Sequence, residues 1–351
     1  MQEKSLSSRS LKLIACNLWL TLAMSISAYS QDLNFSQFYE LPLMRNPALG
    51  GIFDCNMRLK SVYRNQWQSV TVPYQTAAIS AEMKFSAGRG NWHNFGVQVV
   101  YDVAGDSRLK RIEVLPLYTF HLEVAEENYL SLGVMAGPVS SQFDPSKLTW
   151  DDQFVSGQYS PSNPTRQLLR NVNRNYFDMA TGLTFSRPVA ELGSLYIGAS
   201  MYHINKPLVS FDPANENRLD RRYGINAGLT LPSGARDGFT FYTDAFFQGG
   251  HRQNMFGAFY SLSLADEYYD DQNKSTLNLG GVYRWNDAFI PVVKLDYQNF
   301  SFGLSYDVNV SKLKTASQSR GGFELTISYR NCLIGADRTS GLPCPKFGKV
   351  F

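Results

Sequence analysis

The side chains that could act on a substrate are few and scattered. Ser200 lies three residues before His203, a pair that a serine hydrolase would need, and Asp151 and Asp152 could act together as acid and base. Simpler interpretations fit better, because His203 closes an alternating segment and the two aspartates lie in a polar loop. The sequence contains no Gly-x-Ser-x-Gly elbow, no phosphate-binding glycine loop and no His-Glu-x-x-His motif. We therefore expect a protein that is not an enzyme and needs no cofactor.

The cysteines and histidines point to a disulfide rather than to a metal. The four histidines are scattered and none lies within ligand spacing of a cysteine, so no metal site is expected. Cys332 and Cys344 flank a short tail with Gly and Pro and are the easiest pair to close. In an exported chain Cys55 allows two other pairings, which the sequence leaves open.

The elements that must carry these side chains are strands with two chemically different faces. Residues 300–310 place large apolar side chains on one face and Ser, Gly, Asp and Asn on the other. The apolar set is Phe300, Phe302, Leu304, Tyr306, Val308 and Val310. This alternation is typical of a strand with lipid on one side and water on the other. After its N-terminal segment the chain has no apolar run long enough for a membrane helix, so a closed β-barrel is predicted.

Counting the alternating segments gives the expected fold. We predict an all-β protein, a transmembrane antiparallel β-barrel of about fourteen strands over residues 57–330. Such barrels have short turns at one end and long surface loops at the other. The predicted surface loops are residues 138–176, 205–221 and 309–320. Residues 265–272 are long for a turn and residues 286–287 short for a surface loop, so a strand could be miscounted there.

The two ends of the chain read differently from the barrel. Residues 1–30 combine basic side chains with an apolar stretch and predict a secretory signal peptide, whose removal lowers the net charge from +3 to +1. A nearly neutral chain gives no reason to expect nucleic acid as a partner. Residues 31–56, broken by proline and glycine, predict a periplasmic arm or a plug in the lumen. Residues 331–351 predict a short periplasmic tail.

The predicted lumen face is mostly Asn, Ser, Gly and Thr. A porin lumen would instead show clusters of Arg, Asp and Glu on the water-facing positions, so small neutral residues favour a lumen packed by a plug. Within this frame Arg64, flanked by Tyr63 and Trp67 at the start of the first strand, is expected to hold the arm through cation-π and hydrogen-bond contacts.

Motifs spread over the chain resemble those of one family. In the arm and first strand they include Phe35, Gln37, Asn46, Pro47, Tyr63, Arg64, Asn65 and Trp67. In the middle of the chain they include Gly198, His203 and Pro207. Near its end they include Tyr306, Asp307, Gly321, Gly322 and Glu324. With this order, the chain resembles the PorP/SprF family of the type IX secretion and gliding machinery of Bacteroidetes.

The resemblance implies a non-enzymatic protein of the cell outer membrane, in contact with its lipid. A SprF-like member would assist secretion and surface attachment of a C-terminal-domain cargo such as an adhesin. A PorP-like member would belong to the core translocon, with the periplasmic ring and a peptidoglycan-binding component as partners. On either interpretation the surface loops would grip cargo, and the arm and tail would meet periplasmic parts. The alternative is a FadL-like or porin-like transporter of small molecules.

Overall fold

The computed structural model describes residues 32–53, 55–66, 72–155, 157–165, 171–189, 193–212, 216–233, 237–264, 275–311 and 320–331. The predicted signal peptide and residues 332–351 lie outside this range. Compact units divide the chain at Asp32, with Leu33–Phe351 forming the unit that concerns us here. In the described residues, no helix is both long enough and apolar enough to cross a membrane.

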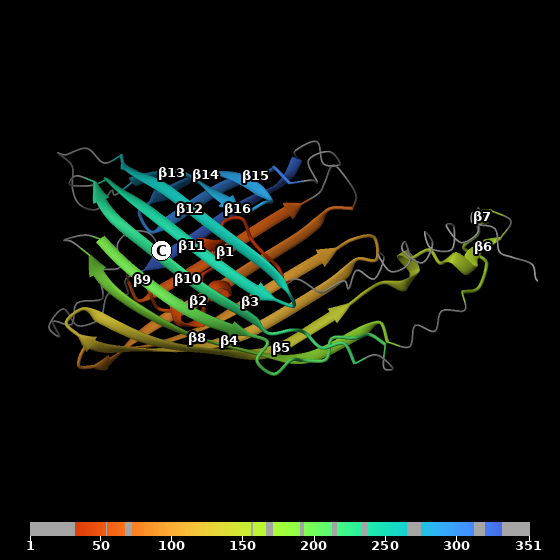
Figure 1. Ribbon diagram of the computed structural model, residues 1–351, viewed down its shortest axis with the longest axis horizontal. Coiled ribbons are helices and arrows are strands. Elements are labelled where there is room, and N and C mark those ends of the chain that lie inside the picture. The colour runs from red at the N-terminus through yellow and green to blue at the C-terminus, as the bar shows by residue number, and fades with distance from the viewer. Residues whose placement is uncertain are drawn as a thin grey trace, which may run out of the picture. The chain divides into compact units, whose positions relative to one another are not determined.

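Within the described residues, fourteen strands close into one antiparallel barrel (Figure 1), which confirms the predicted fold class and strand number. The strands are β1 Met57–Gln66, β2 Tyr74–Gly88, β3 Asn91–Ala104, β4 Leu109–Ala125, β5 Asn128–Gln142, β8 Asn173–Val189, β9 Gly193–Tyr202, β10 Arg222–Ser233, β11 Asp237–Gln248, β12 His251–Ser263, β13 Ser275–Arg284, β14 Ala288–Tyr297, β15 Phe300–Asn309 and β16 Arg320–Asn331. Each pairs with its neighbour in the chain, and β1 pairs with β16 from Met57 opposite Asn331 to Gln66 opposite Gly322. We call this last pairing the seam.

The alternation read from the sequence defines the two faces of the wall. Along β15, Phe300, Phe302 and Leu304 are about half exposed, whereas Ser301 and Ser305 are buried. Period-two alternation sends successive side chains to opposite faces of a strand. The apolar face is therefore the outer surface of the barrel, and the small polar face lines the lumen.

The connections divide the barrel into two ends. We call the end with connections 143–172, 203–221 and 310–319 the long-loop end, and the other the short-turn end. The long loop predicted at 138–176 is shorter, because β5 continues to Gln142 and β8 begins at Asn173. No strand is miscounted among those described. Residues 264–274 do join β12 to β13 at the short-turn end, and residues 285–287 do join β13 to β14 at the long-loop end.

The long loop carries its own small elements. They are η3 Pro145–Lys147, η4 Asp151–Gln153 and the hairpin strands β6 Phe154–Val155 and β7 Gln158–Tyr159. The side chain of Gln153 donates to the carbonyl of Asn163, and that of Asn163 donates back to the carbonyl of Gln153. These reciprocal bonds close the base of the hairpin. Figure 1 shows β6 and β7 beyond the ends of β5 and β8.

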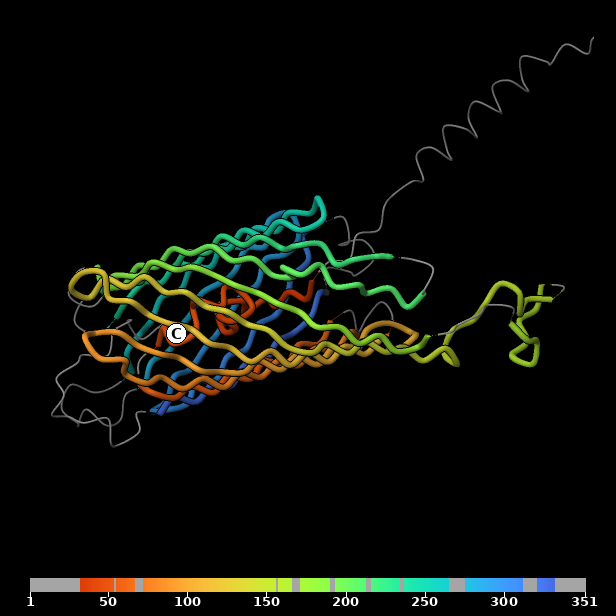
Figure 2. The backbone as a smooth tube through the Cα atoms, turned by 90° about the horizontal axis from the view of Figure 1, so that it is seen from below, coloured from red at the N-terminus to blue at the C-terminus, as the bar shows by residue number. Residues whose placement is uncertain are grey.

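The N-terminal segment lies inside the barrel. Residues 33–53, which we call the plug, contain the short helices η1 Phe38–Glu40, α2 Pro42–Arg45 and η2 Pro47–Leu49. Nearly all of its side chains are buried, and Figure 2 shows its red trace enclosed by the strands. Of the two possibilities that the sequence left open, the structure has the plug. The expectation that this segment meets periplasmic parts stays a prediction, and nearly all side chains of residues 33–53 are covered by the barrel wall.

Candidate functional site

The candidate site is the contact between the plug and the lumen wall. The plug is too short to form a core alone, so local signals shape it and the wall stabilises it. Pro42 and Pro47 occupy the first turns of α2 and η2, where proline fits because its missing N–H needs no partner. The side chain of Asn46 accepts the Ala48 N–H at 2.8 Å and caps η2.

Asn46 also ties the plug to two strands. Its amide group donates to the carbonyls of Leu183 and Ala199 and to the hydroxyl of Thr184, each at 3.1 Å.

The barrel wall beside Pro47 carries a glycine because the plug backbone approaches it closely. A Cβ added to Gly133 would lie 2.3 Å from the Pro47 carbonyl carbon. Any side chain there would push the plug away from the wall.

Replacing Asn46 with Ala should destabilise the protein by about 2–4 kcal/mol. The substitution removes the cap of η2 and leaves buried acceptors on β8 and β9 without their donor. The midpoint of urea unfolding in detergent measures the loss. Asn205→Ala is the control, since the Asn205 amide also donates to a strand carbonyl, at 2.6 Å, but is exposed. An equal loss in both variants would contradict the anchoring role of Asn46.

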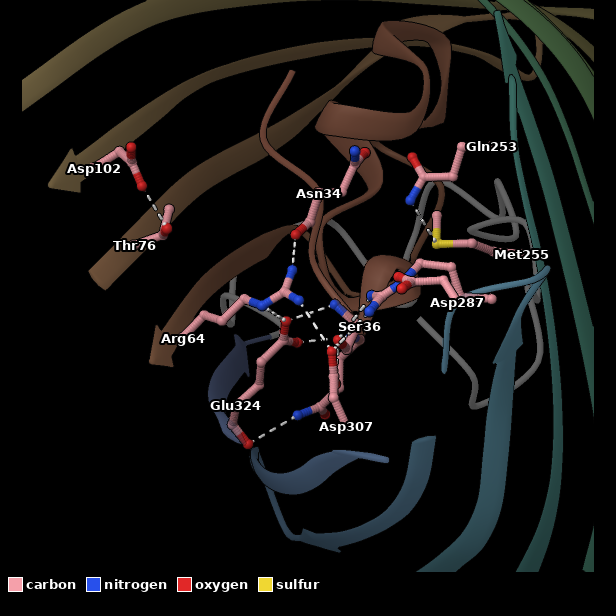
Figure 3. Close-up of polar contacts among 12 residues, drawn as sticks. Asn34, Ser36, Arg64, Thr76, Asp102, Gln253, Met255, Asp287, Asp307 and Glu324 are labelled. Carbon is pink, nitrogen blue, oxygen red and sulfur yellow. Dashed lines mark hydrogen bonds and ion pairs between the residues drawn. The ribbon is translucent and has the colours of Figure 1, made fainter. Parts of the chain in front are cut away.

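A buried ionic cluster joins the plug to the strands beside the seam (Figure 3). The Glu324 carboxylate on β16 accepts the backbone N–H groups of Ser36 at 2.5 Å and Gln37 at 2.7 Å. Arg64 on β1 pairs with the same carboxylate at 3.2 Å and with Asp307 at 3.0 Å. We call these residues, with Arg284, the seam cluster.

Asp307 and Arg284 complete the seam cluster. Asp307 on β15 accepts the Ser36 hydroxyl at 2.5 Å, and Arg284 on β13 pairs with Asp307 at 2.9 Å. Two guanidinium groups thus face two carboxylates, and all four side chains are buried. Arg284 also pairs with the partly exposed Asp287 carboxylate, just after β13. Buried ions need both a partner of opposite charge and saturated hydrogen bonds, and this cluster provides both.

Arg64 holds the plug, but not by the predicted ring contacts. It donates to the Asn34 carbonyl in addition to its two ion pairs. Tyr63 points to the outer face, where it packs near Phe323 at a ring separation of 6.2 Å. Neighbouring residues of a strand face opposite ways, so Tyr63 cannot stack on Arg64. Trp67 lies outside the described residues.

A second ionic contact surrounds Glu40, a plug residue. Its carboxylate receives Lys60 of β1 at 2.7 Å and Lys294 of β14 at 2.6 Å. Asp296 lies 3.9 Å from the same Lys294 ammonium. Burial alone would raise the pKa of Glu40, but the two ammonium groups dominate and hold that pKa well below its usual value.

The Glu40 contact should make stability depend on pH in the acid range. A carboxyl whose pKa is lower in the folded state contributes stability above its unfolded pKa, about 4.5, and loses it as the pH falls further. The urea midpoint of the parent should exceed that of Glu40→Gln near pH 7. The difference should begin to shrink below pH ~4.5 and continue to shrink as the pH falls. A gap that stays constant down to pH ~3 would contradict this assignment.

A third contact fixes the middle of the plug. Arg45 binds Asp244 of β11 through two nitrogens, at 2.8 and 2.7 Å, and both side chains are buried. The guanidinium also lies 5.0 Å from the centre of the Phe38 ring and 5.5 Å from that of Tyr242. Burial would lower the pKa of Arg45, but Asp244 raises it above its usual value, so Arg45 stays charged.

A fourth contact holds the last part of the plug. Glu82 of β2 accepts the Gly51 N–H at 2.9 Å and pairs with Arg58 of β1 at 2.6 Å. Lys84 donates to the Phe53 carbonyl at 2.5 Å, near the short-turn end of β2. The contacts of residues 34–36 lie toward the long-loop end. Asn34 accepts a bond from Arg222, the first residue of β10, and Ser36 accepts one from Arg284, the last residue of β13. The plug therefore reaches from one end of the lumen to the other.

The remaining motif residues separate into three groups. Phe35 and Pro47 are buried in the plug, and Gly198 faces Asn46 from β9. Gly321 and Gly322 lie where β16 approaches Asp307 and Asn65. Tyr306 is on the lipid face and 43% exposed, which removes it from any lumen site.

His203 belongs to a different place in the fold. It follows β9 with a positive φ of 56°, and its Nδ1 lies 2.8 Å from Asp178 of β8. Pro207 accepts the Leu219 N–H at 2.9 Å in the same connection. The Ser200 hydroxyl donates to the Arg45 carbonyl at 2.8 Å rather than to a catalytic histidine. These residues support the connection of β9 to β10 and the plug beneath it.

Cys55 is disulfide-bonded. A disulfide of Cys55 was an alternative that the sequence left open. The predicted pair of Cys332 with Cys344 lies outside the described residues and stays a prediction.

Sequence reasoning missed most of the lumen charges. The expectation of a neutral lumen is wrong, because Arg58, Lys60, Glu82, Asp244 and Lys294 all face inward and are buried. A signal was present, since Arg58, Lys60 and Arg64 occupy alternate positions of one strand and share its inner face. Glu40 and Arg45 of the plug pair with Lys60, Lys294 and Asp244 of this set, so the lumen charges are neutralised in pairs.

A comparison with known protein families finds one that matches this chain. A family model described as "Type IX secretion system membrane protein PorP/SprF" matches residues 27–329. No curated protein matches the sequence.

Solved structures are also similar to this chain over most of its length. The toluene transporter TbuX of Ralstonia pickettii is 11% identical, with a TM-score of 0.47, 82% of this chain and 92% of that chain covered. The CymD monoaromatic hydrocarbon channel is 12% identical, with a TM-score of 0.46 and coverage of 89% and 97%. A Pseudomonas aeruginosa FadL homologue is 9% identical, with a TM-score of 0.47 and coverage of 81% and 92%.

Proposed function

The chain belongs to the PorP/SprF family of type IX secretion system membrane proteins, and we propose that it serves there as a non-enzymatic outer-membrane component. Its role is to assist the secretion and surface attachment of a C-terminal-domain cargo such as an adhesin, in the manner of SprF. The observation that carries the proposal is the family match over residues 27–329, which includes the plug and nearly the whole barrel.

The proposed placement follows from the barrel. A signal peptide at residues 1–30 delivers the chain to the outer membrane, and the apolar outer face of the strands contacts lipid. Since surface loops of such barrels are the longer ones, the long-loop end faces outward. The short-turn end then faces the periplasmic ring and peptidoglycan-binding partner of the secretion system.

The plug in the lumen favours a protein that holds cargo at the cell surface over one through which cargo passes. Ion pairs at Glu40 and at Asp244 hold the plug in the lumen. The Glu324 and Glu82 carboxylates of the wall add hydrogen bonds from backbone N–H groups of the plug. A folded cargo chain cannot pass a lumen filled in this way. Cargo is therefore expected to meet the protein at its outer surface, after export by another component.

The hairpin of β6 and β7 is the proposed contact for cargo. Phe154, Val155 and Tyr159 are 51%, 58% and 41% exposed, and the rings of Phe154 and Tyr159 lie 5.4 Å apart. Exposed aromatic side chains on a hydrogen-bonded support bind a partner with little loss of conformational entropy.

The first experiment is to compare the surface and secreted proteins of a strain lacking this gene with those of its parent. Loss of one adhesin encoded beside the gene supports the SprF-like role. Loss of many cargo proteins together indicates a core, PorP-like role instead. Unchanged secretion would contradict both and favour the alternative, a FadL-like or porin-like transporter.

The hairpin is tested in the complementing gene. Changing Phe154, Val155 and Tyr159 to Ser should release cargo from the cell surface while the barrel remains folded in the membrane. Leu264→Ser is the matched control, because Leu264 is 50% exposed but lies at the short-turn end. Normal surface cargo in the triple variant would exclude the hairpin as the cargo contact.

A further inference from the structure

Closing the barrel requires one pairing between distant parts of the chain. Twelve of the fourteen strands pair only with sequence neighbours, but the seam joins β1 to β16, with Met57 opposite Asn331. Bringing the ends of so long a segment together costs more conformational entropy than pairing two strands that are neighbours in the sequence. Pairing of β1 with β16 is therefore the step of barrel assembly with the largest entropic cost.

The plug is bonded to strands on both sides of the seam. On one side, Arg64 of β1 donates to the Asn34 carbonyl, and Lys60 of β1 pairs with Glu40. On the other side, the plug contacts four successive strands. These contacts are Arg284 of β13 and Asp307 of β15 with Ser36, Lys294 of β14 with Glu40, and Glu324 of β16 with Ser36 and Gln37.

The plug is covalently connected to β1, so its contacts with β13–β16 also position β1. Phe53 ends the plug only four residues before Met57 begins β1. A plug bound to β13–β16 therefore holds β1 close to its partner strand. Tethering of this kind replaces an encounter between distant segments by one within a short linker and raises the local concentration of β1 beside β16.

Glu324 is the centre of this arrangement. It lies directly opposite Arg64 in the register of the seam, and the two side chains form an ion pair across it. Its other contacts are two successive N–H groups of the plug, so one carboxylate joins β16, the plug and β1. Charge-assisted bonds of this kind are stronger than neutral ones.

We propose that the plug acts as an assembly clamp, which binds the β13–β16 strands through Glu324 and its neighbours and delivers β1 to β16 before the seam closes. This inference concerns folding and does not depend on the proposed role in secretion. It predicts that the seam cluster forms early in folding, whereas plug contacts with other strands form later.

Glu82 provides a matched control within the same protein. Its carboxylate also accepts a plug N–H, from Gly51, and pairs with an arginine of β1, Arg58. However, β1 and β2 are neighbours in the sequence, so this pair does not bridge the seam. Glu324→Gln and Glu82→Gln therefore remove similar chemistry at seam and non-seam positions.

The test is refolding of the full mature chain from urea into detergent or lipid, followed by the shift of the folded band on unheated gels. Reductant is present, so that the disulfide of Cys55 does not contribute. Glu324→Gln should fold about tenfold more slowly than the parent, whereas Glu82→Gln should fold at nearly the parent rate and unfold faster. Equal slowing in both variants, or a normal folding rate in Glu324→Gln, would overturn the proposal.

If Glu324→Gln and Glu82→Gln do not fold, two less disruptive variants test the same proposal. Ser36→Ala removes the hydrogen bond from the plug hydroxyl to Asp307 beside the seam. Thr119→Val removes the hydrogen bond from the Thr119 hydroxyl of β4 to the Pro47 carbonyl of the plug. Each loses one hydrogen bond of the plug. Slower folding in Ser36→Ala alone supports the clamp. Equal folding rates in the two variants contradict it.

Discussion

A chain lacking residues 33–53 should fold more slowly, because it lacks the proposed clamp, but the barrel that it forms should conduct ions across a planar bilayer, whereas the complete protein should not. A barrel of this strand number encloses a lumen that side chains of the wall alone do not fill. In the structure the plug fills it, with buried side chains such as Leu43, Leu49 and Phe53. Removal of the plug leaves the charged inner faces of the strands in contact with water, a path that ions can follow.

Single-channel recording measures this effect, and the band shift on unheated gels shows whether the shortened barrel has folded. Gly133→Leu is a second variant that keeps the whole chain, because its side chain would displace the plug backbone at Pro47. Ala136→Leu is its control, three residues along β5 and on the other face. Steady conductance by the unaltered protein would contradict the closed lumen and favour the transporter alternative.

Replacing Asp244 with Ala should be among the most destabilising single substitutions in the plug contact, at about 3–5 kcal/mol. It leaves the Arg45 guanidinium charged and buried without the carboxylate that binds it at 2.7 and 2.8 Å. Removing one member of a buried ion pair costs more than the pair contributes, because the remaining charge has no solvent. Urea unfolding in detergent measures the loss.

The double variant Arg45→Met with Asp244→Leu separates the two origins of this effect. It removes both charges, and Met keeps an apolar contact with the rings of Phe38 and Tyr242. We expect its stability to lie within about 1–2 kcal/mol of the parent. A double variant as unstable as Asp244→Ala would show that hydrogen-bond geometry, rather than an unpaired charge, accounts for the loss.

Much of the fold could be predicted from local pattern. Alternation with period two identified strands such as β3, β5 and β15, because one face of each strand meets lipid and the other does not. The number of strands followed from counting these segments. Loop boundaries were less accurate at β5 and β8, where Ser140 and Asn175 continue the strands beyond the apolar band. Strand pairing outside lipid needs no apolar side chain, so hydropathy does not report it.

The candidate site was predictable in its residues but not in its contacts. The family-like motifs contained Gln37, Arg64, Asp307 and Glu324, which the structure brings together. They also contained Tyr63 and Tyr306, which face lipid and have no part in it. A motif records positions along the chain, and residues of the lumen and the lipid face occur side by side in every strand.

The sequence by itself determined the strands, their inner and outer faces and the break in pattern over residues 31–56, because each depends on neighbours in the chain. Only the tertiary structure decided that this segment fills the lumen and that Glu40 meets Lys60 and Lys294, whereas Arg45 meets Asp244. Several strands present inward-facing charges, and Coulomb attraction does not distinguish among carboxylates of equal charge. The choice is made by the path of the plug, whose prolines, cap and close approach to Gly133 place each charge beside one partner.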